Sequence, residues 1–107
     1  MKTLAAISFL TGALLSHAQV RIDKTAWSGW PNSYKISNGT VELIVTSDIG
    51  PRVMRYAFLG EKNVFWEDPA GLGKQGEPKW ELRGGHRIWV GPEDIRYTYP
   101  PDNGPVK

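Results

Sequence analysis

The chain of 107 residues contains no cysteine. Disulfide bonds, thiolate metal ligands and a cysteine nucleophile are therefore excluded, and so is attachment of a lipid through cysteine. A domain of this composition must be held together by its core, which is necessarily modest in a chain of this length.

The sequence also has little excess of either charge. It carries 13 basic and 11 acidic residues, a formal net charge of +2. Binding to the phosphates of nucleic acid requires a concentrated basic face. The near balance of charge therefore argues against a nucleic-acid partner.

Long apolar runs are missing too, apart from one near the start. Residues 4–15 form an apolar run of about a dozen residues, whereas a membrane-spanning helix needs about 20. Lys2 precedes the run, and the small residues Ser16 and Ala18 stand where a signal peptidase reads. We expect residues 1–18 to be a cleaved signal peptide, with a membrane anchor as the alternative. The mature protein is then secreted or periplasmic and has no membrane contact.

Histidine is scarce, with only His17 and His86. One mature histidine and scattered carboxylates do not supply the ligand spacing of a zinc site, and no serine nucleophile motif is present. We therefore expect no metal and no other cofactor. Residues 71–76 match G-x-G-x-x-G, but a dinucleotide site needs a helix after that turn. The prolines on both sides favour a surface loop.

Helical periodicity is absent beyond residue 18, and short runs rich in β-branched and aromatic residues alternate with turn residues. The strongest cue is Asn38-Gly39 between residues 34–37 and 40–47, which predicts a hairpin with a type I′ turn. Asn38-Gly39-Thr40 is also a formal glycosylation sequon, although the hairpin explains the same residues.

This pattern predicts an all-β fold, an antiparallel sheet or sandwich. Residues 19–33 read as a turn-rich N-terminal segment, and residues 34–107 as the β domain. Further strands are expected at residues 52–59, 63–67, 80–90 and 96–99, with a loop over residues 68–79.

Candidate binding residues gather in residues 81–94, with the sequence ELRGGHRIWVGPED. The Gly-Gly pair within a strand pattern indicates a bulge or a close approach of a ligand to the backbone. Arg83 and Arg87 offer forks of donors that suit hydroxyls, carboxylates or phosphates. His86 can exchange a proton near neutral pH.

The second half of this segment adds Trp89, which can stack on a sugar ring, and Glu93, which can accept hydrogen bonds from hydroxyls. Glu93 and Asp94 are also candidates for a calcium site. In an extended segment His86 faces away from Arg87 and Trp89, so these side chains do not all line one pocket. The alternative is that His86 is an ordinary strand histidine and the arginines are solvated.

Two stretches together resemble a known family. They are ISNGTVELIVTSDIGPRVMRYAFLGEKNVFWE, residues 36–67, and RGGHRIWVGPEDIRYTYPPDNGPV, residues 83–106. In their order and spacing they resemble the N-terminal part of galactose mutarotase-like proteins, the aldose 1-epimerase superfamily. The likeness is strongest to secreted bacterial members of unassigned function.

The resemblance implies an antiparallel β-sandwich with a sugar site across one sheet. In the enzymes a histidine acts as general acid and a glutamate as general base. Arg83 matches a ligand-binding arginine, and His86 matches a histidine of the secreted group, which makes it the candidate catalytic residue. Here Gly-Gly-His-Arg replaces the Gly-Gly-Ile-Pro of the enzymes.

The family's glutamate base lies later in the chain than Lys107. We therefore expect this sequence to be an N-terminal fragment, with aldose 1-epimerase activity expected only of the full-length protein. The expected function is carbohydrate binding by Arg83, Arg87, Trp89 and Glu93, with His86 as catalytic candidate. The alternatives are a non-catalytic carbohydrate-binding or structural module, and a complete small β domain. The sequence does not indicate an oligomeric state.

Overall fold

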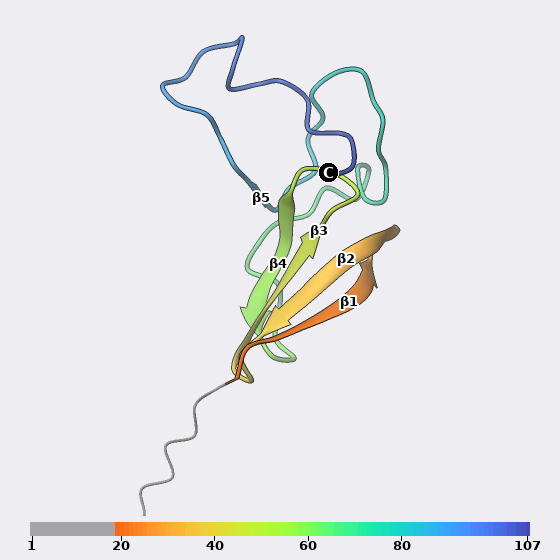
Figure 1. The fold of residues 1–107 in the computed structure, drawn as a ribbon, viewed down its shortest axis with the longest axis vertical. Helices are drawn as coiled ribbons and strands as arrows, with labels where there is room; N and C mark the ends of the chain where they lie inside the picture. The colour runs from red at the N-terminus through yellow and green to blue at the C-terminus, as the bar shows by residue number, and fades with distance from the viewer. Residues whose placement is uncertain (1–18) are drawn as a thin grey trace, which may run out of the picture.

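The computed structural model describes residues 19–107, so the expected signal peptide lies outside the described residues. Within residues 19–107 the chain is all-β, as predicted, and has no helix. Five strands form one open antiparallel sheet (Figure 1). In this part of the chain no helix is long and apolar enough to cross a membrane.

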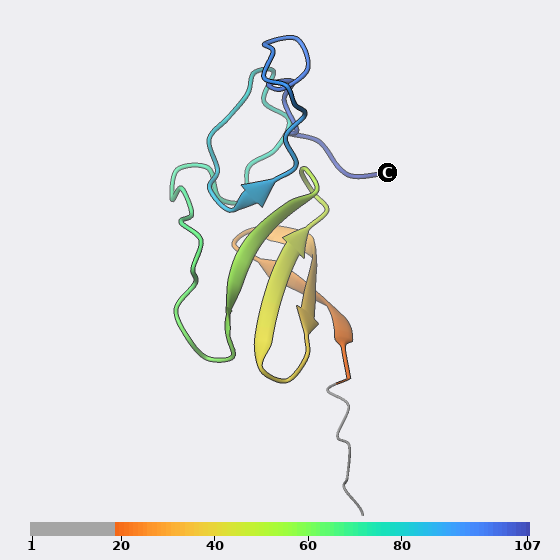
Figure 2. The ribbon, with the colours of Figure 1, turned by 90° about the vertical axis from the view of Figure 1, so that its left-hand side faces the viewer.

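The strands pair in the order in which they occur in the chain, so the sheet is a simple meander. The segments that follow the fourth strand form loops, most of which lie beyond one end of the sheet (Figures 1 and 2). The strands are β1 (Arg21–Trp27), β2 (Trp30–Ser37), β3 (Val41–Thr46), β4 (Arg52–Phe58) and the short β5 (His86–Arg87).

The prediction of a turn-rich segment over residues 19–33 is wrong, because these residues form β1 and the start of β2. The two strands are joined by Ser28 and Gly29, whose φ angles are 47° and 93°. Positive φ at both central residues is the geometry of a type I′ hairpin turn. Trp27 and Trp30 flank this turn as a cross-strand pair.

The hairpin predicted at Asn38-Gly39 is confirmed, since β2 and β3 pair in register on either side of it. The predicted type I′ turn is wrong, because only Gly39 has a positive φ, of 86°. The Asn38 side chain instead accepts hydrogen bonds from the backbone N–H groups of Thr40 and Val41, at 3.0 and 2.9 Å. This local bonding of an asparagine to the following backbone replaces the tighter turn.

The strand predicted over residues 52–59 is confirmed as β4. The other later predictions are wrong: residues 63–67 and 96–99 form no strand, and residues 80–90 keep only His86 and Arg87 in the sheet. Over residues 94–98 the chain turns instead, with the N–H of Thr98 donating to the carbonyl of Asp94 at 2.8 Å.

The hydrophobic core lies where the loops meet the end of the sheet. Trp30, Ile49 and Met54 are fully buried there, and Leu72 packs against them from the loop between β4 and β5. The indole N–H of Trp30 donates to the carbonyl of Lys74 at 3.0 Å. The core therefore joins the loops to the β1–β2 hairpin.

The sheet has one strongly apolar face. Strand pairing aligns Ile22, Ile36, Leu43 and Tyr56 in one row across four strands, and Ile22 and Tyr56 are 65% and 42% exposed. Because side chains alternate along a strand, polar residues such as Lys35 face the other way. The buried side chains of β3 are Ile44 and Thr46, on the face opposite Leu43, so the apolar row is the more open side of the sheet.

Candidate functional site

The glycine pair that begins the candidate segment allows close packing of the chain on itself. Gly84 and Gly85 have φ angles of 80° and 66°. A Cβ at Gly84 would lie 2.1 Å from the carbonyl oxygen of Trp66, and one at Gly85 would lie 2.4 Å from that of Val53. The close approach that the sequence indicated here is therefore made by the protein's own backbone.

His86 and Arg87 lie on opposite faces of the sheet, as their alternation in an extended segment predicted. His86 pairs with Val53, and Arg87 pairs with Arg52. His86 is exposed, and its ring stacks on Phe65 with 6.3 Å between centroids. It thus extends the apolar face of the sheet.

Arg83 is 1% exposed, and its guanidinium forms hydrogen bonds with other groups of the protein. One terminal nitrogen donates to the carbonyl of Gly71 at 2.9 Å, and the other donates to Asn103 Oδ1 at 3.2 Å and to the carboxylate of Glu77. Asn103 in turn donates to the carbonyls of Glu77 and Lys79. Arg83 therefore ties the loop of residues 71–79 to the C-terminal segment.

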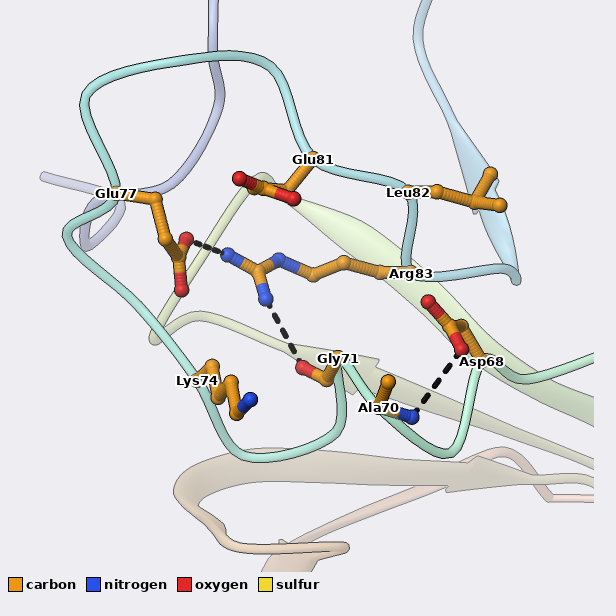
Figure 3. A pocket seen from close by; sticks show the side chains of 8 residues that line it. All are labelled: Asp68, Ala70, Gly71, Lys74, Glu77, Glu81, Leu82 and Arg83. Atoms are coloured by element: carbon orange, nitrogen blue, oxygen red, sulfur yellow. Dashed lines mark hydrogen bonds and ion pairs between the residues drawn. The ribbon is translucent and has the colours of Figure 1, made fainter.

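A pocket of about 260 Å³ lies beside this arginine (Figure 3). In Figure 3 the Arg83 side chain lies across the pocket, with its guanidinium between Glu77 and Gly71. Because these contacts use both terminal nitrogens and the side chain is 1% exposed, Arg83 is not open to a ligand. The pocket is lined by Asp68, Ala70, Gly71, Lys74, Glu77, Glu81, Leu82 and Arg83.

Arg87 and Trp89 make the second arrangement in the segment. The guanidinium carbon of Arg87 lies 4.5 Å from the centroid of the Trp89 ring, a cation–π contact. Arg87 also forms an ion pair with Asp102 at 3.6 Å and donates to the carbonyl of Pro100 at 3.4 Å. Asp102 and Pro100 thus hold the guanidinium that packs against the indole of Trp89.

Two further aromatic rings surround Trp89. Tyr99 meets it edge-on with 5.7 Å between centroids, and Trp80 lies tilted at 6.5 Å. All three rings remain partly open, with Trp89 47% exposed. We call Trp80, Trp89 and Tyr99 the aromatic cluster.

A shallow pocket of about 380 Å³ adjoins the aromatic cluster. The hydroxyl of Thr98 donates to the carbonyl of Val90 at 2.8 Å and accepts the N–H of Asp94 at 2.9 Å, which closes the loop that forms the pocket. The pocket is lined by Trp89, Val90, Gly91, Glu93, Thr98 and Tyr99.

Glu93 gives this pocket its polar edge. The hydroxyl of Tyr99 donates a hydrogen bond to the Glu93 carboxylate. This bond, together with the negative charge of Glu93, raises the pKa of the Tyr99 hydroxyl above its ordinary value. Next to it, hydrogen bonds from Arg96 lower the pKa of Asp94. Glu93 therefore stands at the rim as an acceptor aligned by a tyrosine.

Of the five candidate residues, the structure brings three together and separates two. Arg87, Trp89 and Glu93 share one site, whereas Arg83 lies within its own hydrogen-bond network and His86 lies on the opposite sheet face. Sequence reasoning missed Trp80 and Tyr99 as partners of Trp89. The sequence is rich in tryptophan and tyrosine, but it does not show the loop path that brings Trp80 and Tyr99 to Trp89.

Within residues 19–107 no group of three or more histidine, aspartate or glutamate side chains is placed to hold a metal ion. Comparison of the chain with family models, curated proteins and solved structures gave no significant match.

Proposed function

We propose that this protein binds carbohydrate at the aromatic cluster formed by Trp80, Trp89 and Tyr99. The observation that carries the proposal is a partly exposed tryptophan that packs against Arg87 and whose neighbour Glu93 offers a carboxylate at the rim of a shallow pocket. A ligand site combines an apolar surface with a few placed polar groups. A sugar ring has the matching chemistry.

Each part of the site has a role in this proposal. The apolar C–H face of the sugar stacks on the exposed part of Trp89, since an indole offers a large rigid surface at low entropic cost. The ring hydroxyls donate to Glu93, which keeps acceptor capacity beyond its bond from Tyr99. Arg87 acts as a positioning residue that holds Trp89 through cation–π contact.

The family resemblance remains part of the proposal. We infer an all-β protein of the galactose mutarotase-like type, and the open antiparallel sheet without helix in residues 19–107 supports this. A mutarotase site needs a general acid near the ring oxygen and a general base near the anomeric hydroxyl. His86 is the candidate acid, and it stands on the opposite face of the sheet from Arg87.

This separation favours binding without catalysis at the aromatic cluster. His86 points to the face opposite Arg87, whose guanidinium contacts Trp89. Epimerase activity is the second candidate function, and it belongs to the apolar face, where the exposed His86 stacks on Phe65. The two candidates therefore place the sugar at different positions.

The test is isothermal titration of the full chain with a panel of aldohexoses and aldopentoses. We expect at least one sugar to bind, and Trp89→Ala to weaken that binding about tenfold or more, through loss of about 1.4 kcal/mol or more of stacking. Trp66→Ala is the matched control, because Trp66 is 59% exposed and lies outside the aromatic cluster. Equal effects of the two substitutions would refute the assignment.

A polarimetric assay of anomer interconversion on the same samples separates the second candidate. If His86→Asn abolishes interconversion while Trp89→Ala leaves it unchanged, the apolar face is the functional one. If the protein does not accelerate interconversion of any sugar and Trp89→Ala abolishes binding, the aromatic cluster is a binding site without catalysis.

A further inference from the structure

The outer edge of β1 is complementary in charge to itself, because Arg21 and Asp23 carry opposite charges on the same face of the strand. β1 is the edge strand of the sheet, and the first four of its residues are exposed. Among residues 19–107 no other segment pairs with this edge. An edge strand presents unpaired N–H and C=O groups, which form a template for another strand.

We propose that this edge pairs with the same edge of a second copy of the chain, in one antiparallel register centred on Ile22. A contact of one surface patch with itself has two-fold symmetry. When the axis stands perpendicular to the sheet, each face stays on its own side, so only residues of the same face become opposite neighbours. In the proposed register Ile22 meets Ile22 of the copy, and Arg21 meets Asp23 of the copy twice.

Among the registers centred on residues 21–24, charge selects this one over the others that keep the faces aligned. A register centred on Arg21 places Arg21 opposite itself. A register centred on Asp23 or Lys24 likewise places that charge opposite its own copy. Directly opposed like charges destabilise an antiparallel pair, whereas opposite charges stabilise it. Charged residues commonly keep edge strands apart, but among the registers centred on residues 21–24 only the one centred on Ile22 opposes no like charges.

The fold limits the pairing to a short, regular segment. The β1–β2 register is uninterrupted from Arg21 to Thr25, and it shifts between Thr25 and Trp27. Such an irregularity bends the edge away from a flat partner. Pairing over residues 20–24 leaves this part outside the contact.

The proposed dimer also extends the apolar face. Ile22 begins the row that continues through Ile36, Leu43 and Tyr56. In the dimer the two rows join at the axis, where the Ile22 side chain, 65% exposed in one copy, lies beside its equivalent. Apolar contact at the centre then adds to the ion pairs on the opposite face.

Exchanging the charges of Arg21 and Asp23 tests the proposal. Sedimentation equilibrium of the full chain over a wide range of concentration should show a monomer–dimer equilibrium. Arg21→Asp and Asp23→Arg, each alone, should raise the dissociation constant about tenfold or more, because each places like charges opposite one another twice. The double variant Arg21→Asp/Asp23→Arg should restore the wild-type constant.

Lys62→Asp is the matched control for Arg21→Asp, since it makes the same change of charge on an exposed loop away from the edge. It should leave the dissociation constant unchanged. Far-ultraviolet circular dichroism of every variant distinguishes loss of pairing from loss of the fold. A wild-type chain that stays monomeric at all concentrations would overturn the proposal, as would a folded double variant that fails to regain dimerisation.

Discussion

His86 and Arg87 are consecutive in the chain but lie on opposite faces of the sheet, opposite Val53 and Arg52 respectively. This relationship divides the candidate segment into two parts. Arg87 continues toward Trp89, Glu93 and the loops, whereas His86 joins the apolar face beside Phe65. The proposed binding site and the candidate proton-transfer residue can therefore be tested by separate substitutions.

The first prediction concerns His86. Because it lies on the opposite face from the aromatic cluster, His86→Asn should leave sugar affinity within about twofold of wild type, a change in free energy of less than about 0.5 kcal/mol. Isothermal titration with the best-bound aldose measures this. A loss as large as that of Trp89→Ala would place the histidine in the sugar site.

The second prediction concerns Arg83. Replacing this buried residue by methionine leaves Glu77, Asn103 and the carbonyl of Gly71 without their donor. Removing one partner of such a buried network should lower the free energy of unfolding by about 3 kcal/mol. Urea unfolding followed by circular dichroism measures the change.

Arg96→Met is the control for Arg83, because Arg96 is exposed and its side chain contacts only the neighbouring Asp94 and Tyr97. It should leave the urea midpoint unchanged. An Arg83→Met variant with wild-type stability and no sugar binding would show instead that Arg83 contacts the ligand.

The third prediction concerns Gly84. Alanine at this position needs an unfavourable positive φ and places its Cβ 2.1 Å from the carbonyl oxygen of Trp66. We expect Gly84→Ala to cost about 3 kcal/mol of stability through strain and overpacking. Gly104→Ala, where an added Cβ meets no atom within 4 Å, should be close to neutral. Thermal unfolding of both variants makes the comparison, and equal melting temperatures would contradict it.

The fourth prediction concerns the pH dependence of Tyr99. Its hydrogen bond to Glu93 raises its pKa above the ordinary value of 10.0. A raised pKa in the folded state means that the stabilisation is fully present below the unfolded pKa and is lost as pH rises through the folded pKa. Alkaline titration of tyrosine absorbance in wild type and Glu93→Gln measures the shift.

In Glu93→Gln the charged acceptor is gone, so Tyr99 should ionise at a lower pH than in wild type. The variant Glu61→Gln changes an exposed carboxylate elsewhere in the chain and serves as control. Unchanged ionisation of Tyr99 in Glu93→Gln would refute the interaction.

The sequence was sufficient to predict the all-β class, the Asn38-Gly39 hairpin and the strand that became β4, because each rests on local alternation and turn chemistry. β1 was missed, since Ser28-Gly29 was read as part of an irregular segment. Its exposed, charged residues also lack the apolar alternation that marks a half-buried strand.

The candidate site was predicted in part for the same reason. The opposite orientation of His86 and Arg87 follows from the period of a strand, which is local information. The burial of Arg83 depends on Asn103, 20 residues away, and the pairing of Trp80 with Trp89 depends on the path of a loop. Contacts of this kind are set by tertiary packing, which a single sequence does not display.

The most direct test of the central claim is a sugar titration followed by the indole N–H resonances of the five tryptophans. If the aromatic cluster binds carbohydrate, the resonance of Trp89 should shift on saturation with an aldose, with a smaller shift at Trp80 and none at Trp66. If no indole resonance shifts at any sugar concentration, or if Trp66 shifts while Trp89 does not, the proposed site is contradicted.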